Sequence, residues 1–206
     1  HLRAAGFPER NIILLTGENA TRTGMQKYLE EWLPRNVGAD STVFFYYSGH
    51  GAPDTRTGDA YLVPWDGDPQ FLQSTAYSLK QVYASLSALK AREIVVALDA
   101  CFSGAGGRSV IAKGLRPLVT KFDEDIALDR RMVVFAAASG DEVTGMDEEH
   151  GHGLFTYYFL KGLNEQIPKG HTTAAELYGY LKPKVQDAAR RQNREQTPIM
   201  RGASQF

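Results

Sequence analysis

The chain has 206 residues, of which 43% are hydrophobic and 23% are charged, and its formal net charge is −1. This composition is typical of one globular domain with a substantial core, and the balanced charge argues against a general nucleic-acid or membrane-surface binder. With no apolar run long enough to span a bilayer, no visible signal peptide and a single cysteine, we expect a cytoplasmic protein without an internal disulfide.

Apolar runs alternate with amphipathic segments along the chain. In order, we expect a strand over 11–16, a helix over 25–33, strands over 42–47 and 60–64, a helix over 77–89, strands over 94–98 and 132–138, helices over 154–163 and 174–192, and an extended segment over 196–200. The last helix should bend or break near Pro183. This alternation predicts an α/β fold with a mostly parallel central sheet and helices on both faces.

Two of the predicted strands end in residues that carry chemistry. The run 94–98 leads into Asp99 and Cys101, which is the only cysteine, and the run 42–47 leads into Ser48 and His50. If these strands are parallel neighbours, His50 and Cys101 project from the carboxyl edge of the sheet, where α/β proteins bind ligands. Since a nearby imidazole raises the population of the reactive thiolate, the pair predicts nucleophilic chemistry.

A long segment without clean periodicity follows Cys101. Residues 108–131 contain six basic side chains, namely Arg108, Lys113, Arg116, Lys121, Arg130 and Arg131. A loop of this length inside one domain is usually functional or disordered.

The motifs YYSGHG (46–51) and DACFSG (99–104) together resemble the caspase-like cysteine peptidases, and the metacaspase and bacterial caspase-like group is the closer branch. His50 precedes Cys101 by 51 residues, which is close to the caspase spacing. The resemblance runs over 11–163, with an echo at 196–198. It implies a caspase-like fold in a single domain, with 1–107 similar to the large subunit, 108–131 a loop, and 132–206 similar to the small subunit.

The resemblance implies a catalytic dyad. Cys101 would attack a peptide carbonyl, and His50 would act as general acid/base. The backbone N–H groups of Gly51 and Cys101 would form the oxyanion hole, whose donors stabilise the transition state by about 3–4 kcal/mol each.

The residues around the dyad predict specificity for a basic P1 side chain. Asp99 stands where caspases proper have a neutral Gln, and 143–145 lack the arginine with which those enzymes bind a P1 aspartate. A carboxylate in the S1 pocket pairs with Arg or Lys, with Arg preferred if the contact is bidentate. Ser48 matches a position that lines the same pocket in metacaspases. The alternative is that Asp99 is a buried structural acid.

The resemblance also bears on cofactors and partners. Caspase-like peptidases of this kind require no cofactor, although some metacaspases bind calcium. Asp66 and Asp68 lie near the positions of the calcium-binding aspartates of metacaspases, whereas Arg108 stands where an acidic ligand is expected, so calcium dependence is doubtful. The family's opening strand would precede His1, so a regulatory segment or partner would have to cover the sheet edge that its absence exposes. Because the loop 108–131 is basic, it is a candidate site of activating self-cleavage.

Other classes of function are weaker. A catalytically silent caspase-like module, acting as an interaction or regulatory domain, has no need of both Cys101 and His50. The sequence has no GxSxG motif, as an α/β hydrolase would, and no P-loop or dinucleotide motif, as a nucleotide binder would. His150 and His152 lie among acidic residues but without the spacing of metal ligands.

Overall fold

A four-stranded sheet runs through the middle of the molecule in the order β1-β5-β6-β9. Its strands are β1 (Thr42–Ser48), β5 (Glu93–Asp99), β6 (Met132–Ala136) and β9 (Ile199–Gly202). The first three are parallel, and β9 pairs antiparallel with β6. This computed structural model describes residues 1–54, 56–102, 128–139, 142–147, 151–166 and 173–202. The predicted α/β class with a mostly parallel sheet is confirmed.

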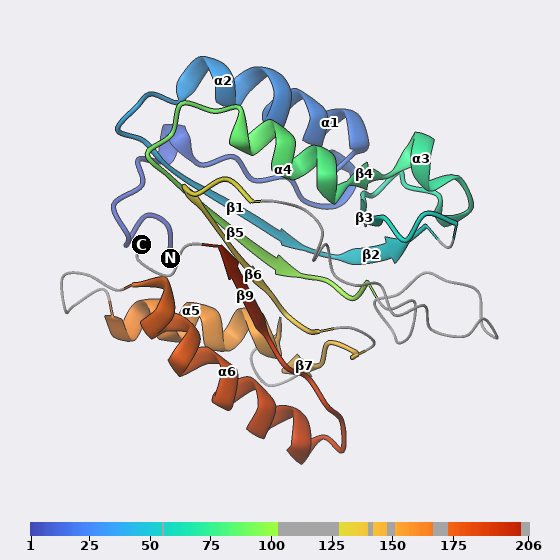
Figure 1. Cartoon of the computed structure of the whole chain (residues 1–206), viewed down its shortest axis with the longest axis vertical. Coiled ribbons are helices and arrows are strands. Elements are labelled where there is room, and N and C mark those ends of the chain that lie inside the picture. Colours follow the sequence, from blue (N-terminus) through green and yellow to red (C-terminus); the bar gives the residue numbers. More distant parts are fainter. Residues whose placement is uncertain (55, 103–127, 140–141, 148–150, 167–172, 203–206) are drawn as a thin grey trace.

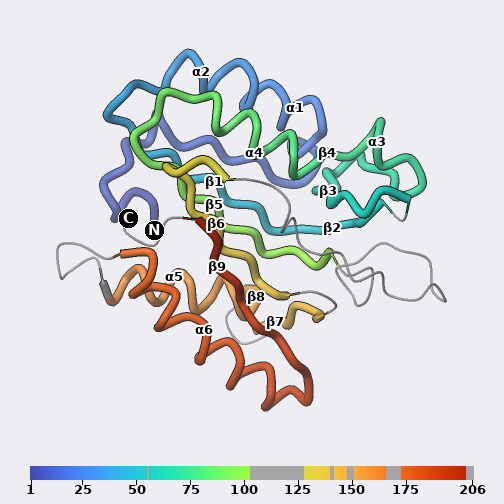
Figure 2. Tube along the Cα trace, in the orientation of Figure 1, coloured from blue at the N-terminus to red at the C-terminus, as the bar shows by residue number. Residues whose placement is uncertain are grey.

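Helices cover both faces of this sheet (Figures 1 and 2). One face carries a helical run made of α1 (Arg22–Gln26), a π-helical segment (Lys27–Trp32) and α2 (Leu33–Asn36), together with α4 (Leu79–Ser87). The other carries α5 (Leu154–Gln166) and α6 (Ala174–Arg191). Thr21 begins the first run as its N-cap, since its hydroxyl accepts a hydrogen bond from the Gly24 N–H.

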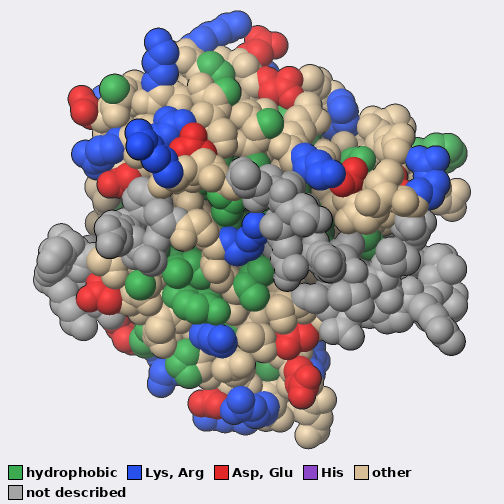
Figure 3. All heavy atoms as spheres, viewed as in Figure 1, with side chains coloured by type: hydrophobic (Ala, Val, Ile, Leu, Met, Phe, Trp, Pro, Cys, Tyr) green, Lys and Arg blue, Asp and Glu red, His purple; other side chains and the backbone are tan. Residues whose placement is uncertain are grey.

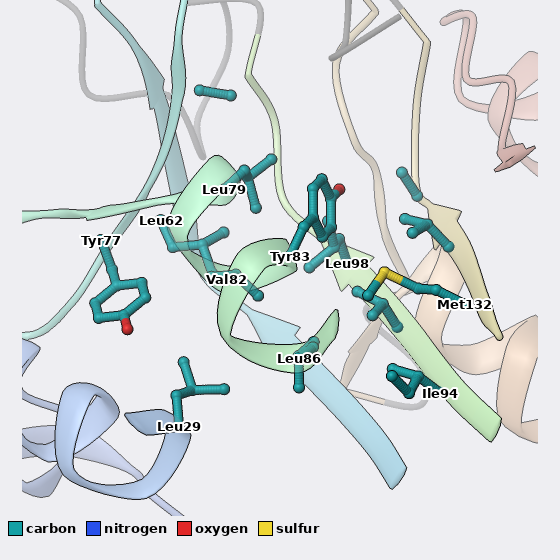
Figure 4. Close-up of a cluster of buried hydrophobic side chains, with 14 of the residues drawn as sticks. Leu29, Leu62, Tyr77, Leu79, Val82, Tyr83, Leu86, Ile94, Leu98 and Met132 are labelled. Atoms are coloured by element: carbon teal, nitrogen blue, oxygen red, sulfur yellow. The ribbon is translucent and has the colours of Figure 1, made fainter. Parts of the chain in front are cut away.

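The alternation of side chains along β5 divides the core into two layers. Ile94, Val96 and Leu98 pack beneath α4, as the close-up in Figure 4 shows for Ile94 and Leu98. Val95 and Ala97 face the opposite way, towards α5 and α6. Because β5 is buried on both faces, its sequence is a continuous apolar run rather than an alternating one.

Shorter strands extend the carboxyl end of the sheet. β2 (His50–Pro53), β3 (Ala60–Val63) and β4 (Tyr77–Ser78) form an antiparallel sheet of their own, in the order β2-β3-β4. A 3-10 turn (Pro69–Phe71) and α3 (Leu72–Thr75) connect β3 to β4. β7 (Met146–Asp147) pairs antiparallel with β8 (His152–Gly153) just before α5.

The strand predicted over 11–16 is wrong. Residues 12–16 are not part of a strand and lie between two 3-10 turns, Glu9–Asn11 and Gly17–Asn19. The apolar run IILL gave the signal, but a strand also needs a hydrogen-bonded partner, and within the described residues β1 pairs only with β5. Leu14 is consequently 79% exposed.

The helices also differ from the prediction at several points. The first helical run continues through Pro34 to Asn36, and α4 begins at Leu79 because Tyr77 and Ser78 form β4. The break expected near Pro183 is absent, because α6 runs without interruption from Ala174 to Arg191. The buried stripe on α6 explains this continuity, since tertiary packing can offset the hydrogen bond that proline removes. The stripe consists of Leu177, Leu181, Val185 and Ala189.

The surface of the described part is of mixed charge. On the face drawn in Figure 3, basic and acidic side chains are interspersed. No helix in the described ranges is both long enough and apolar enough to cross a bilayer. Most of the predicted loop over 108–131, including Arg108, lies outside the described residues.

Candidate active site

The segments that carry His50 and Cys101 are neighbours at the carboxyl edge of the sheet. The β1–β5 ladder ends in the pair Ser48 and Asp99, and the Gly49 N–H donates a hydrogen bond to the Asp99 carbonyl at 3.3 Å. His50 and Cys101 each lie two residues beyond that last pair. The expectation that the two strands are parallel neighbours is therefore confirmed.

Gly51 lies directly against the backbone of the Cys101 segment. A Cβ atom at Gly51 would stand 2.5 Å from the Cys101 carbonyl oxygen and 2.7 Å from a ring carbon of Phe102. Any side chain at this position would therefore push the two segments apart. The absence of a side chain at Gly51 is what lets the backbone after His50 approach the cysteine this closely.

Tyr47 holds the turn at His50 in place. Its hydroxyl lies 2.8 Å from the carbonyl oxygens of both His50 and Val63. Burial holds the pKa of this phenol well above its ordinary value, so the hydroxyl keeps its proton and remains a donor. His50 itself is exposed, and its ring makes no hydrogen bond within the described part of the chain. The backbone of His50 is thus held in place by Tyr47.

The thiol of Cys101 is buried, with 1% of the residue exposed. Its sulfur lies 2.9 Å from the Thr144 hydroxyl oxygen and accepts a hydrogen bond from the Thr144 N–H at 3.0 Å. Thr144 belongs to the segment that connects β6 to β7. In this structure Thr144 stands over the sulfur and takes the place that a peptide carbonyl would need.

Asp99 is fully buried on the face of the sheet that α5 covers. The Thr156 hydroxyl, in the first turn of α5, donates to its Oδ2, and the Tyr46 hydroxyl lies 2.8 Å from the Thr156 hydroxyl. A Cβ atom on Gly153 would collide with the same carboxylate. A buried carboxylate needs such donors, because an unpaired one would be costly. In this arrangement Asp99 acts as a buried structural acid. It could bind a P1 side chain only after Gly153 and Thr156 move away from the carboxylate.

Ser48 lies beside Asp99 in the ladder and on the same side of the sheet, because directly paired residues point to the same face. It is exposed. The predicted set is therefore brought together at one edge: His50 and Gly51 after β1, Cys101 after β5, and the pair Ser48–Asp99 at the ends of the two strands.

Sequence reasoning did not single out Thr144, Thr156 and Gln196. Each is a buried polar residue whose partner is distant in the chain: Thr144 contacts Cys101, Thr156 contacts Asp99, and the Gln196 side chain accepts from the Gly145 N–H. Threonine and glutamine are common in loops, so residue type alone gives no signal. The available signals were the resemblance at 196–198 and the position of 143–145, where caspases bind the P1 side chain.

The described residues offer little for a metal. No group of three His, Cys, Asp or Glu side chains within them could hold an ion. Asp66 accepts the Arg22 N–H at the start of α1, and Asp68 caps the 3-10 turn Pro69–Phe71 by accepting the Gln70 N–H, so both carboxylates already bind backbone amides. His150 lies outside the described residues.

We compared the sequence with models of known protein families. The family model of the caspase domain, Peptidase C14, matches residues 2–205 of the chain. The match therefore spans the sheet, both layers of helices and the edge that carries His50 and Cys101. A search among curated proteins finds no match.

Proposed function

Because the chain belongs to the caspase domain family of peptidases, we propose that it is a cysteine endopeptidase that cleaves proteins after Arg or Lys. The observation that carries the proposal is the contact between the backbone of Gly51, next to His50, and the backbone of Cys101. It joins two motifs 50 residues apart at the edge where α/β sheets bind ligands.

The proposed reaction is an acyl transfer with Cys101 as the nucleophile. Its sulfur attacks the scissile carbonyl carbon, and the carbonyl oxygen becomes an oxyanion. The N–H groups of Gly51 and Cys101 stabilise that oxyanion, a role supported by the direct contact of these two residues. His50 takes the thiol proton as the sulfur attacks, and it gives this proton to the leaving amine when the C–N bond breaks. Water, deprotonated by His50, then attacks the thioester, and the C–S bond breaks to release the acid product and the Cys101 thiol, to which His50 returns the proton.

The proposed specificity rests on the carboxylate of Asp99, with Ser48 beside it. A guanidinium can bind a carboxylate through two parallel hydrogen bonds, which favours Arg over Lys. In the structure Gly153 and Thr156 cover Asp99, so a P1 side chain reaches it only when the β7–β8 pair and the first turn of α5 move. A P1 aspartate would be repelled by the same carboxylate.

The test is cleavage of matched fluorogenic peptides with Arg, Lys, Asp or Ala at P1. We expect turnover of the Arg and Lys peptides that is lost in Cys101→Ala, and a loss of the preference for basic residues in the isosteric variant Asp99→Asn. Turnover of the Asp peptide would overturn the specificity. If no peptide is cleaved, with or without calcium, by the wild type or by a variant in which Thr144 no longer covers Cys101, the catalytically silent interaction module becomes the better description.

Activation is a separate part of the proposal. We propose self-cleavage within 108–131, because an enzyme specific for basic P1 residues meets six of them there. Intact-mass measurement after incubation should find new fragments from the wild-type chain and none from Cys101→Ala. Fragmentation that persists in Cys101→Ala would point to a contaminating peptidase.

A further proposal concerns the free side of β1. We propose that a strand from a regulatory segment or partner pairs there, because β1 has a strand on one side only within the described residues. Tyr46 on β1 is 42% exposed. Hydrogen exchange tests this on the chain alone: the outward amides of β1 should exchange faster than the amides of β5. Equal protection of both strands would contradict it.

A further inference from the structure

The segment from Glu142 to Asp147, here called the strap, covers the sulfur of Cys101. Thr144, at its centre, places both its N–H and its hydroxyl within 3.0 Å of the sulfur. Attack on a peptide requires the carbonyl carbon to come within about 3–3.5 Å of the nucleophile. Because Thr144 occupies that space, the strap and a substrate exclude each other.

Gln196 holds the middle of the strap. Its amide is buried, with 1% of the residue exposed, and the proposed reaction does not use it. Its Oε1 accepts the Gly145 N–H at 2.7 Å, while its Nε2 donates to the Ala137 carbonyl at 2.9 Å. One side chain thereby ties the strap to the residue that follows β6. A buried amide with both ends satisfied is a rigid link, since breaking either bond leaves a polar group unpaired.

Both ends of the strap are held as well. At the first, a single carboxylate oxygen of Glu142 accepts the Ser139 N–H, the Ser139 hydroxyl and the Thr197 N–H, the last at 2.6 Å. At the second, the Gln192 side chain donates to the Met146 carbonyl at 2.9 Å. The position of Thr144 over the sulfur is therefore set by contacts at three points.

We infer that the strap is an autoinhibitory latch and that Gln196 is the positioning residue that keeps it closed over Cys101. The latch acts in two ways, because Thr144 shields the sulfur and the adjoining β7–β8 pair brings Gly153 onto the Asp99 carboxylate. Opening it requires the bond between Gln196 and Gly145 to break. The inference rests on the proposed role of Cys101 as the nucleophile.

The test is the alkylation rate of the single cysteine by iodoacetamide, followed by intact mass, which needs no peptidase activity. The wild-type thiol should react at least tenfold more slowly in the native chain than in urea. Gln196→Ala should raise the native rate about tenfold, as expected for the loss of the one buried hydrogen bond that joins Gln196 to the strap. Glu142→Gln is a milder second variant that should also raise it and that keeps the test valid if Gln196→Ala does not fold.

Tyr178→Phe is the matched control. The Tyr178 hydroxyl donates a hydrogen bond to the Pro198 carbonyl, which lies two residues after Gln196 and is not part of the strap. It should react like the wild type. Native wild-type alkylation as fast as in urea, or unchanged rates in the strap variants, would overturn the latch. So would an equal rise in the control. Faster alkylation of the strap variants without any peptide cleavage would uphold the latch and count against the peptidase.

Discussion

Replacing Gly51 with alanine tests the closest backbone approach in the site. The added Cβ would meet the Cys101 carbonyl oxygen at 2.5 Å, whereas ordinary contact begins at about 3.4 Å. One of the two segments must therefore move by about 0.9 Å, the difference between these distances. Overpacking of this kind typically costs about 1–3 kcal/mol of folding free energy. A displacement near 1 Å within an active site lowers turnover by about 10²-fold.

The matched control makes the same chemical change where there is room. Gly179 lies within α6, and a Cβ there would meet nothing within 4 Å. Gly179→Ala should therefore stabilise the chain by up to about 1 kcal/mol, because alanine is the better helix former, and should leave turnover unchanged.

Urea unfolding gives the stability of both variants, and cleavage of the Arg peptide gives the turnover. The two substitutions should change stability in opposite directions. A Gly51→Ala variant with a wild-type urea midpoint and turnover within threefold of the wild type would refute the argument, because it would mean that the segments are not in contact.

Two further predictions concern the scaffold. Leu86 lies in the fully buried stripe of α4, so Leu86→Ala should lower the free energy of unfolding by about 3 kcal/mol. Leu14 is exposed, so Leu14→Ala should change it by less than about 0.5 kcal/mol. Equal shifts of the urea midpoint in the two variants would contradict the placing of Leu86 in the core. Hydrogen bonds from the side chain and the N–H of Arg131 hold the pKa of Asp129 below its ordinary value. The stabilisation from Asp129 should therefore be complete above the pKa of the unfolded chain, about 4, and should be lost as the pH falls through the lower folded pKa. Asp129→Asn should lower the stability by about 1–2 kcal/mol at pH 7. The gap to the wild type should narrow as the pH falls below about 4, and a gap that stays unchanged in acid would contradict this.

The elements that could be predicted are those whose signal is local. The strands β1 and β5 are apolar runs that end in glycine or small residues, and the helices carry their own buried stripes. The same rules also place His50 and Cys101 at strand ends, so the edge that carries them follows from the sequence. The run 12–16 has the same local signal as β1, but its state depends on a pairing partner that no local pattern reveals.

The closed state of the site could not be predicted. It depends on contacts such as that of Gly145 with Gln196, 51 residues away, and on the register that brings Gly153 against Asp99. Each contact joins residues whose types are ordinary for loops and helix ends. Only the three-dimensional arrangement distinguishes a threonine over the sulfur from a threonine in solvent.

The free side of β1 has a consequence for how the chain behaves in concentrated solution. Residues 42–48 read TVFFYYS, which is rich in β-branched and aromatic side chains and has no charge or proline. An edge strand of this kind, which has no partner on its outer side within the described residues, can template the addition of another extended chain, which is the first step of fibril growth. Whatever pairs with β1 would therefore also protect the protein from ordered aggregation.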